Sequence, residues 1–177
     1  MKKNLFTIMA IVAVAFGLSN AAKAQTQIKQ VTVNVELKDV IGIGPDGPSG
    51  SSVVDFLYET ANDYNNDKTV TIPNQFNVTS TKAYNILVKG SGDFIGQTTA
   101  ATTLPLNILK VSARTAGGSS FGNEVTPTTI DQNVITGAAA TLSQSFDVLY
   151  KIEKNIDLLT KEKQKYSTQL TYSITAQ

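Results

Sequence analysis

The chain has 177 residues, of which only 16% are charged, and it contains no Cys, no His and no Trp. Without Cys there is no disulfide, thiol catalysis or lipid anchor on cysteine, and without His there is no Ser-His-Asp triad or usual zinc site. Residues 25–177 carry twelve basic against fourteen acidic residues, and this net charge of −2 gives no electrostatic basis for binding nucleic acid.

The first 24 residues have the layout of a cleaved secretory signal. Two lysines precede an apolar stretch, Leu5–Leu18, and Ala22-Lys23-Ala24 matches the small-x-small cleavage pattern. Fourteen helical residues span only about 21 Å, short of the ~30 Å hydrocarbon core, which disfavours a transmembrane anchor. We therefore expect a signal peptide at 1–24, a single domain at 25–177, no transmembrane segment after cleavage, and export to the periplasm, cell surface or extracellular space.

The rest of the chain alternates apolar and polar residues almost throughout, which is typical of half-buried β-strands. The first such segment carries Val31, Val33, Val35 and Leu37 on one face. The Gly- and Pro-rich residues 42–50 then predict a loop. The segments expected to be strands are 31–37, 54–58, 70–72, 76–78, 84–88, 104–113, 130–135, 146–152 and 166–176.

Three local features qualify this pattern. Pro73 should end its strand or mark a sheet edge, since proline cannot donate a ladder hydrogen bond. Residues 112–130 are rich in Gly, Ser and Thr and predict a long exposed loop. Residues 155–165 combine helical spacing with Lys and Glu, and we expect at most one or two helical turns there.

Seven to nine short strands separated by turn residues predict an all-β fold, an antiparallel β-sandwich of the Ig-like or adhesin-like kind. Alternation, rather than continuous apolar runs, favours antiparallel sheets with one wet face each. A small closed β-barrel is the alternative fold.

One loop has the residue types of a calcium site. Asp63, Asn65 and Asp67 place oxygen ligands at alternate positions, and Ca²⁺ takes six to eight oxygens. The full calcium-loop pattern would need Gly and Glu where this chain has Lys68 and Asn74, and Asx residues also cap ordinary turns. Calcium is thus the one candidate cofactor, with a plain turn as the alternative.

Enzymatic patterns are weak, and we expect a protein that is not an enzyme. Acid pairs such as Asp55 with Glu59, or Asp147 with Glu153, can be nominated for glycoside hydrolysis, but any fourteen acids allow such choices. The Gly-rich residues 42–47 superficially echo a nucleotide-binding fingerprint, yet no strand-to-helix turn accompanies them.

Several short segments together carry a family resemblance. They are Val54-Asp55-Phe56, Asp63-Tyr64-Asn65-Asn66-Asp67, Phe76-Asn77-Val78-Thr79-Ser80-Thr81, Tyr84-Asn85-Ile86, Asp131-Gln132, Phe146-Asp147-Val148-Leu149-Tyr150 and the terminal segment 166–177. This layout resembles small exported bacterial β-sandwich proteins and is similar to WxL-type surface domains and to adhesin or pilin-like modules. The resemblance implies a β-sandwich displayed at the cell envelope. Because the chain has no Trp, the Trp-x-Leu signature of the WxL group is absent.

These observations favour a non-enzymatic binding or adhesion module of the cell envelope. Its expected contact surfaces are the loops 42–50 and 116–129, since rigid sheets commonly display function on loops. Its expected partners are an envelope polysaccharide, another envelope protein or a second copy of itself. The alternative is a fibre or pilus-type subunit that donates its alternating N-terminal segment to a neighbouring copy by β-augmentation.

Overall fold

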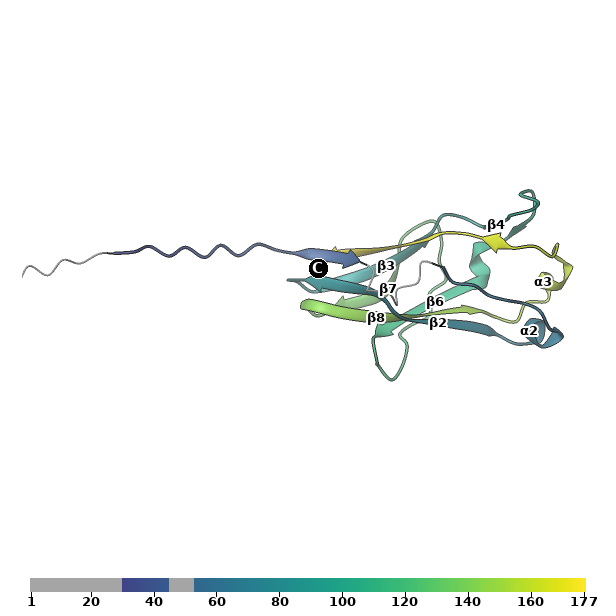
Figure 1. Cartoon of the computed structure of the whole chain (residues 1–177), viewed down its shortest axis with the longest axis horizontal. Helices are drawn as coiled ribbons and strands as arrows, with labels where there is room; N and C mark the ends of the chain where they lie inside the picture. The colour runs from purple at the N-terminus through teal and green to yellow at the C-terminus, as the bar shows by residue number, and fades with distance from the viewer. Residues whose placement is uncertain (1–29, 45–52) are drawn as a thin grey trace, which may run out of the picture. The chain divides into compact units, whose positions relative to one another are not determined.

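The computed structural model describes residues 30–44 and 53–177 (Figure 1). The chain divides into two units at the junction between Leu37 and Lys38, and each unit is described by itself. The expected signal peptide at 1–24 and most of the expected loop at 42–50 lie outside the described residues. Within the described ranges, no helix has the length and apolar character needed to cross a membrane.

The described part of the first unit is a drawn-out segment with no regular secondary structure (Figure 1). Its four alternating apolar residues are exposed: Val31 by 72%, Val33 and Val35 by 80% each, and Leu37 by 90%. The prediction of a half-buried strand at 31–37 is therefore wrong for the single chain. Alternation makes the segment amphipathic, but no described strand pairs with it.

The second unit is built from three antiparallel sheets. The largest has the order β1-β2-β8-β6, the next β10-β3-β7 and the smallest β5-β4-β9. The strands are β1 (Ile41–Gly44), β2 (Lys68–Ser80), β3 (Tyr84–Gly90), β4 (Phe94–Gly96), β5 (Thr103–Leu104), β6 (Leu109–Thr115), β7 (Gln132–Ala138), β8 (Thr141–Ile152), β9 (Tyr166–Ser167) and β10 (Leu170–Ala176). The helical elements are α2 (Ala61–Asn65), η2 (Leu106–Ile108) and α3 (Asp157–Thr160).

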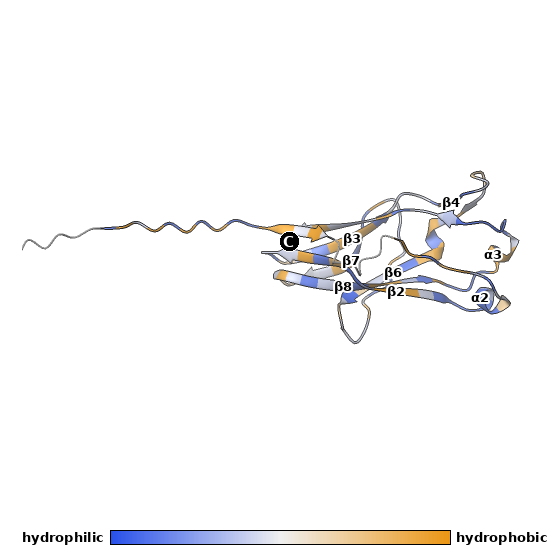
Figure 2. Ribbon diagram, in the orientation of Figure 1, coloured by the Kyte–Doolittle hydropathy of each residue, from blue (hydrophilic) through white to orange (hydrophobic). Residues whose placement is uncertain are grey.

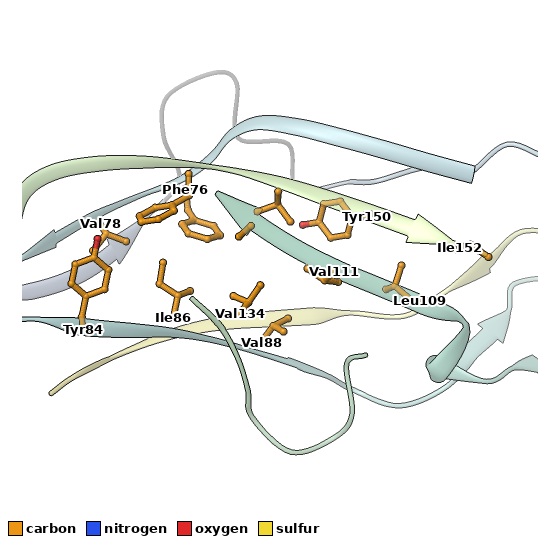
Figure 3. Packing of buried hydrophobic residues seen from close by; sticks show 13 residues of the cluster. Phe76, Val78, Tyr84, Ile86, Val88, Leu109, Val111, Val134, Tyr150 and Ile152 are labelled. Atoms are coloured by element: carbon orange, nitrogen blue, oxygen red, sulfur yellow. The ribbon is translucent and has the colours of Figure 1, made fainter. Parts of the chain in front are cut away.

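The two larger sheets enclose one hydrophobic core (Figure 3). Apolar and polar residues alternate along the strands (Figure 2), so each sheet turns one apolar face inward. The described sheets stay open rather than closing into a barrel, and the predicted all-β sandwich is confirmed. The fully or nearly fully buried core residues are Phe76, Val78, Tyr84, Ile86, Val88, Leu109, Val111, Ala113, Val134, Phe146, Val148, Tyr150 and Ile152.

Ten strands are described, slightly above the expected seven to nine. The expected strands 31–37 and 54–58 are absent, 70–72 and 76–78 merge into β2, and two other expected strands are each split. Two strands were not expected: β4, and β1, which occupies residues 42–44 of the predicted loop 42–50. Between β5 and β6, Pro105 precedes the short helix η2, and residues 168–169 interrupt the ladder between β9 and β10. The expected helical turn near residue 157 is confirmed as α3. The loop expected to carry Asp63, Asn65 and Asp67 is partly helical, because α2 extends to Asn65, and β2 begins directly after it at Lys68.

Pro73 marks a sheet edge but does not end its strand. β2 continues through it with a register shift between Ile72 and Phe76, where Asn74 adopts a positive φ of 47°. The partner β1 pairs only with residues 77–80, so the missing proline N–H leaves no ladder position empty. The bulge accommodates the proline within a continuous strand.

The hydroxyl of Tyr84 provides a test of the core. Tyr84 is fully buried, burial raises its pKa, and its hydroxyl has no hydrogen-bond partner in the described part of the chain (Figure 3). Since an unpaired buried hydroxyl costs about 1–3 kcal/mol, Tyr84→Phe should raise the free energy of unfolding by about 1–2 kcal/mol in urea titration. The matched control Tyr172→Phe removes the 3.0 Å hydrogen bond that the Tyr172 hydroxyl donates to the Tyr150 hydroxyl. This variant should lower the free energy of unfolding by about 1 kcal/mol. A loss of stability in both variants would contradict this account.

Candidate functional site

The residues predicted to bind calcium lie around α2. The carboxylate of Asp63 caps this helix, accepting hydrogen bonds from the backbone N–H groups of Glu59 (3.0 Å) and Thr60 (2.8 Å). Its other oxygen pairs with the Lys68 ammonium, and that bond together with the backbone bonds lowers the pKa of Asp63. These bonds use both oxygens of Asp63 within the loop.

The other two candidate ligands have different surroundings. Asp67 accepts a 2.9 Å hydrogen bond from the backbone N–H of Lys154, and Asn65 is the last residue of α2. No cluster of three or more Asp or Glu side chains suited to a metal occurs among the described residues. A cation at Asp63 would have to displace Lys68. Calcium binding at Asp63, Asn65 and Asp67 stays a prediction.

Three of the four nominated acids, Asp55, Asp147 and Glu153, are engaged in separate ion pairs. The Asp55 carboxylate lies 3.1 Å from the Lys165 ammonium, and the Glu153 carboxylate lies 3.1 Å from the Lys151 ammonium. Asp147 is buried, and its Oδ2 atom lies 3.0 Å from the Arg114 Nε atom. Its Oδ1 atom accepts a 3.0 Å hydrogen bond from the backbone N–H of Asn74. The carboxylate of Asp147 thus holds the bulge of β2, which is a structural role.

The expected contact loop 116–129 lies along an edge strand. The backbones of Val125 and Val111 exchange two hydrogen bonds of 2.8 Å, and Gly122 donates one of 3.0 Å to the Ala113 carbonyl. Pro127 is fully buried. Part of the loop therefore covers the outer edge of β6. More than half of residues 116–129 are exposed, so the expectation of a mostly exposed loop is confirmed for this range.

The described part of the second unit contains an apolar cavity whose lining includes Tyr64 of α2 and Leu158 of α3. These two helices lie at the same end of the sandwich (Figure 1). The volume of the cavity is about 660 Å³, within the size range of binding pockets. A smaller recess of about 320 Å³ shares several lining residues with it and extends toward α3. The apolar lining of the larger cavity is Val54, Phe56, Leu57, Tyr58, Tyr64, Phe94, Leu104, Ile108, Ile152, Leu158 and Tyr166.

One wall of this cavity is the extended segment 54–58. Val54, Phe56 and Tyr58 are half-buried, whereas Val53 and Leu57 are exposed, so the predicted alternation of faces is confirmed. The predicted strand is wrong, because the backbone of residues 54–58 makes no hydrogen bond to the backbone of another described residue. Lys68 instead holds the segment through the Leu57 carbonyl, and Lys165 holds it through Asp55.

Basic residues line the rim of the cavity beside its aromatic side chains. Lys161, Lys163 and Lys165 all belong to the lining, and the Lys163 ammonium lies 5.1 Å from the centre of the Tyr64 ring. The Tyr58 and Tyr64 rings are 5.1 Å apart. Sequence analysis did not find this site, because it read residues 54–58 as a strand paired within a sheet.

No known protein family model matches this chain, and no curated protein matches it. The geometry of the described residues therefore carries the functional argument.

Proposed function

We propose that this protein is an exported, non-enzymatic structural subunit that assembles head to tail by donating residues 31–37 as a β-strand to a neighbouring copy. The observation that carries the proposal is the exposure of Val31, Val33, Val35 and Leu37 on one face of a segment that pairs with none of the described strands. An exposed, alternating, β-branched segment is a template for pairing with another chain.

The energetics of donation are favourable. Burying a valine or leucine side chain contributes about 1.5–3 kcal/mol, so four of them supply roughly 6–12 kcal/mol before the costs of ordering and association. The alternate residues Thr32, Asn34 and Glu36 are polar and suit the wet face of an added strand. Backbone hydrogen bonds to an acceptor edge would satisfy the N–H and C=O groups of the donated segment.

The sequence supplies the setting for this assembly. The layout of residues 1–24 supports export, and the resemblance to adhesin and pilin-like modules supports a role at the cell envelope. Recognition of an envelope polysaccharide or another envelope protein stays a prediction from the sequence.

The test is the oligomeric state of the chain beginning at Gln25, measured by size-exclusion chromatography with light scattering over a range of concentrations. We expect assemblies that grow with concentration. Val33→Asp together with Val35→Asp should weaken association about 100-fold or more, because each loses at least ~1.5 kcal/mol of burial and would bury a charge.

The matched control changes the other face of the same segment. Thr32→Asp with Asn34→Asp adds the same two charges at positions that stay in water, and this variant should assemble almost as the parent does, apart from a modest salt-dependent repulsion. A parent protein that remains monomeric throughout, or equal loss of assembly in both variants, would refute strand donation.

A further inference from the structure

We infer that the acceptor for the donated strand is the cavity bounded by the segment 54–58, so that residues 31–37 of a second copy lie along that segment and turn their apolar side chains into the cavity. This inference rests on the proposed function and names its binding site. The cavity supplies what a donated strand requires: an apolar recess and an adjacent extended backbone that makes no hydrogen bond to another described backbone, although the Leu57 carbonyl accepts one from the Lys68 side chain.

The backbone of the acceptor segment is suited to pairing. Residues 54–58 are extended and alternate in burial, so their N–H and C=O groups project sideways as in a strand. No described backbone pairs with them. A strand laid beside them would extend the alternation already present, with Val54, Phe56 and Tyr58 forming the neighbouring apolar row.

Other sheet edges in the described chain are less suitable. The outer edge of β6 is covered by Val125 through two backbone hydrogen bonds. The outer edges of β7 and β10 have no described strand partner, but neither β7 nor β10 contributes a residue to the lining of the cavity. The edge strands β5 and β9 also line the cavity, through Leu104 and Tyr166, but each has only two residues and is too short to pair with a seven-residue donor. The segment 54–58 offers five extended residues beside the cavity whose backbone pairs with no described backbone.

Chain length shows that the donor must come from another copy. The donor leads into β1, whose Ile41 pairs with Ser80 at one end of β2, whereas the cavity is lined by Ile152, which pairs with Lys68 at the other end. Twelve residue steps along β2 correspond to about 40 Å. Val35 lies six residues before Ile41 and can reach only about 20 Å from it, so it cannot enter the cavity of its own copy.

The same geometry determines the type of assembly. The donor is joined through the chain to β1, which pairs at one end of β2, whereas the cavity is lined by residues at the other end, so donor and acceptor are different surfaces. A contact between two different surfaces is heterologous, and it propagates into an open fibre unless the rotation between copies closes a ring.

Engineered thiols give a direct test, because the natural chain has no Cys. Val54→Cys, at the cavity wall, is activated as a mixed disulfide with 2-thiopyridine and mixed with Val35→Cys, which carries the attacking thiolate. Attack expels 2-thiopyridine and forms a disulfide only where the two Cα atoms come within about 7 Å. The control acceptor is Ile130→Cys, activated in the same way, whose parent side chain is 72% exposed and outside the cavity.

We expect the Val35→Cys and Val54→Cys pair to cross-link about tenfold faster or more than the pair with Ile130→Cys, because docking raises the local concentration of the two thiols. Adding Val33→Asp to the donor should abolish that difference. Assembly without preferential cross-linking to Val54→Cys would overturn the acceptor site and leave strand donation intact. Absence of assembly in every protein would overturn both.

Discussion

Replacing Asp147 by alanine is expected to lower the free energy of unfolding by about 3–5 kcal/mol, the usual effect of removing one partner of a buried ion pair. Its side chain is only 7% exposed and accepts hydrogen bonds from Arg114 and from the backbone N–H groups of Asn74 and Gly117. The substitution leaves a guanidinium and two N–H groups without their acceptor. Urea unfolding measures the loss.

The control is Asp131→Ala, which removes an exposed carboxylate 4.0 Å from Lys89. An exposed pair contributes about 0–1 kcal/mol, so this variant should unfold almost as the parent does. Equal effects of the two substitutions would show that Asp147 does not hold the bulge of β2.

Asp147 also predicts a dependence of stability on pH. Burial by itself would raise the pKa of this carboxyl, but the bonds from Asn74, Arg114 and Gly117 outweigh burial and hold the pKa below its ordinary value of 3.8. The carboxylate therefore stabilises the fold above about pH 4, and this contribution is lost as the pH falls through the lowered native pKa. In Asp147→Asn, the loss of stability on acidification should be smaller than in the parent, when urea midpoints are compared from about pH 5 down to about pH 2.

Phe146→Ala should also cost about 3–5 kcal/mol, because it opens a cavity in the middle of the core. Phe146 is 1% exposed, and its ring centre lies 5.7 Å from that of Phe76. The change affects both sheets, because the ring centre of Phe76 on β2 also lies 5.2 Å from that of Tyr172 on β10. Chemical denaturation gives the measurement, and a native stability of 5–15 kcal/mol leaves the variant near its folding limit.

Leu142→Ala on the same strand is the matched control for that prediction. Leu142 is 84% exposed, so its truncation should change stability by less than about 0.5 kcal/mol. If Leu142→Ala were as harmful as Phe146→Ala, the inward face of β8 would be assigned wrongly.

The core of this fold could be predicted from alternation because burial follows the two-residue period of a strand. Ile86 and Val88 on β3, and Phe146 and Val148 on β8, are buried as the sequence indicates. The period alone does not say whether a strand has a partner. Segments 31–37 and 54–58 alternate in the same way as β3, yet neither pairs with a described strand.

The cavity could not be predicted for a related reason. Its walls come from residues far apart in the sequence, such as Phe56, Phe94 and Leu158, and only tertiary packing brings them together. The role of Asp147 was hidden likewise, since its partners Asn74 and Arg114 lie 73 and 33 residues away. A local pattern predicts which face of a strand is apolar, whereas a site of this kind depends on which strands become neighbours.

The short strand β1 has a mechanical consequence. It pairs over four residues with β2, and the ladder is extended by Val40, whose N–H donates to the Thr81 hydroxyl at 3.0 Å, and by the ion pair of Asp39 with Lys82. A force that pulls the preceding segment along the axis of β1 loads the hydrogen bonds between β1 and β2 in shear. All of these bonds then bear the load at the same time, rather than breaking one after another. The antiparallel register at Ile41–Gly44 thus acts as a clamp, and its strength sets the tension at which the segment would be pulled away from β2.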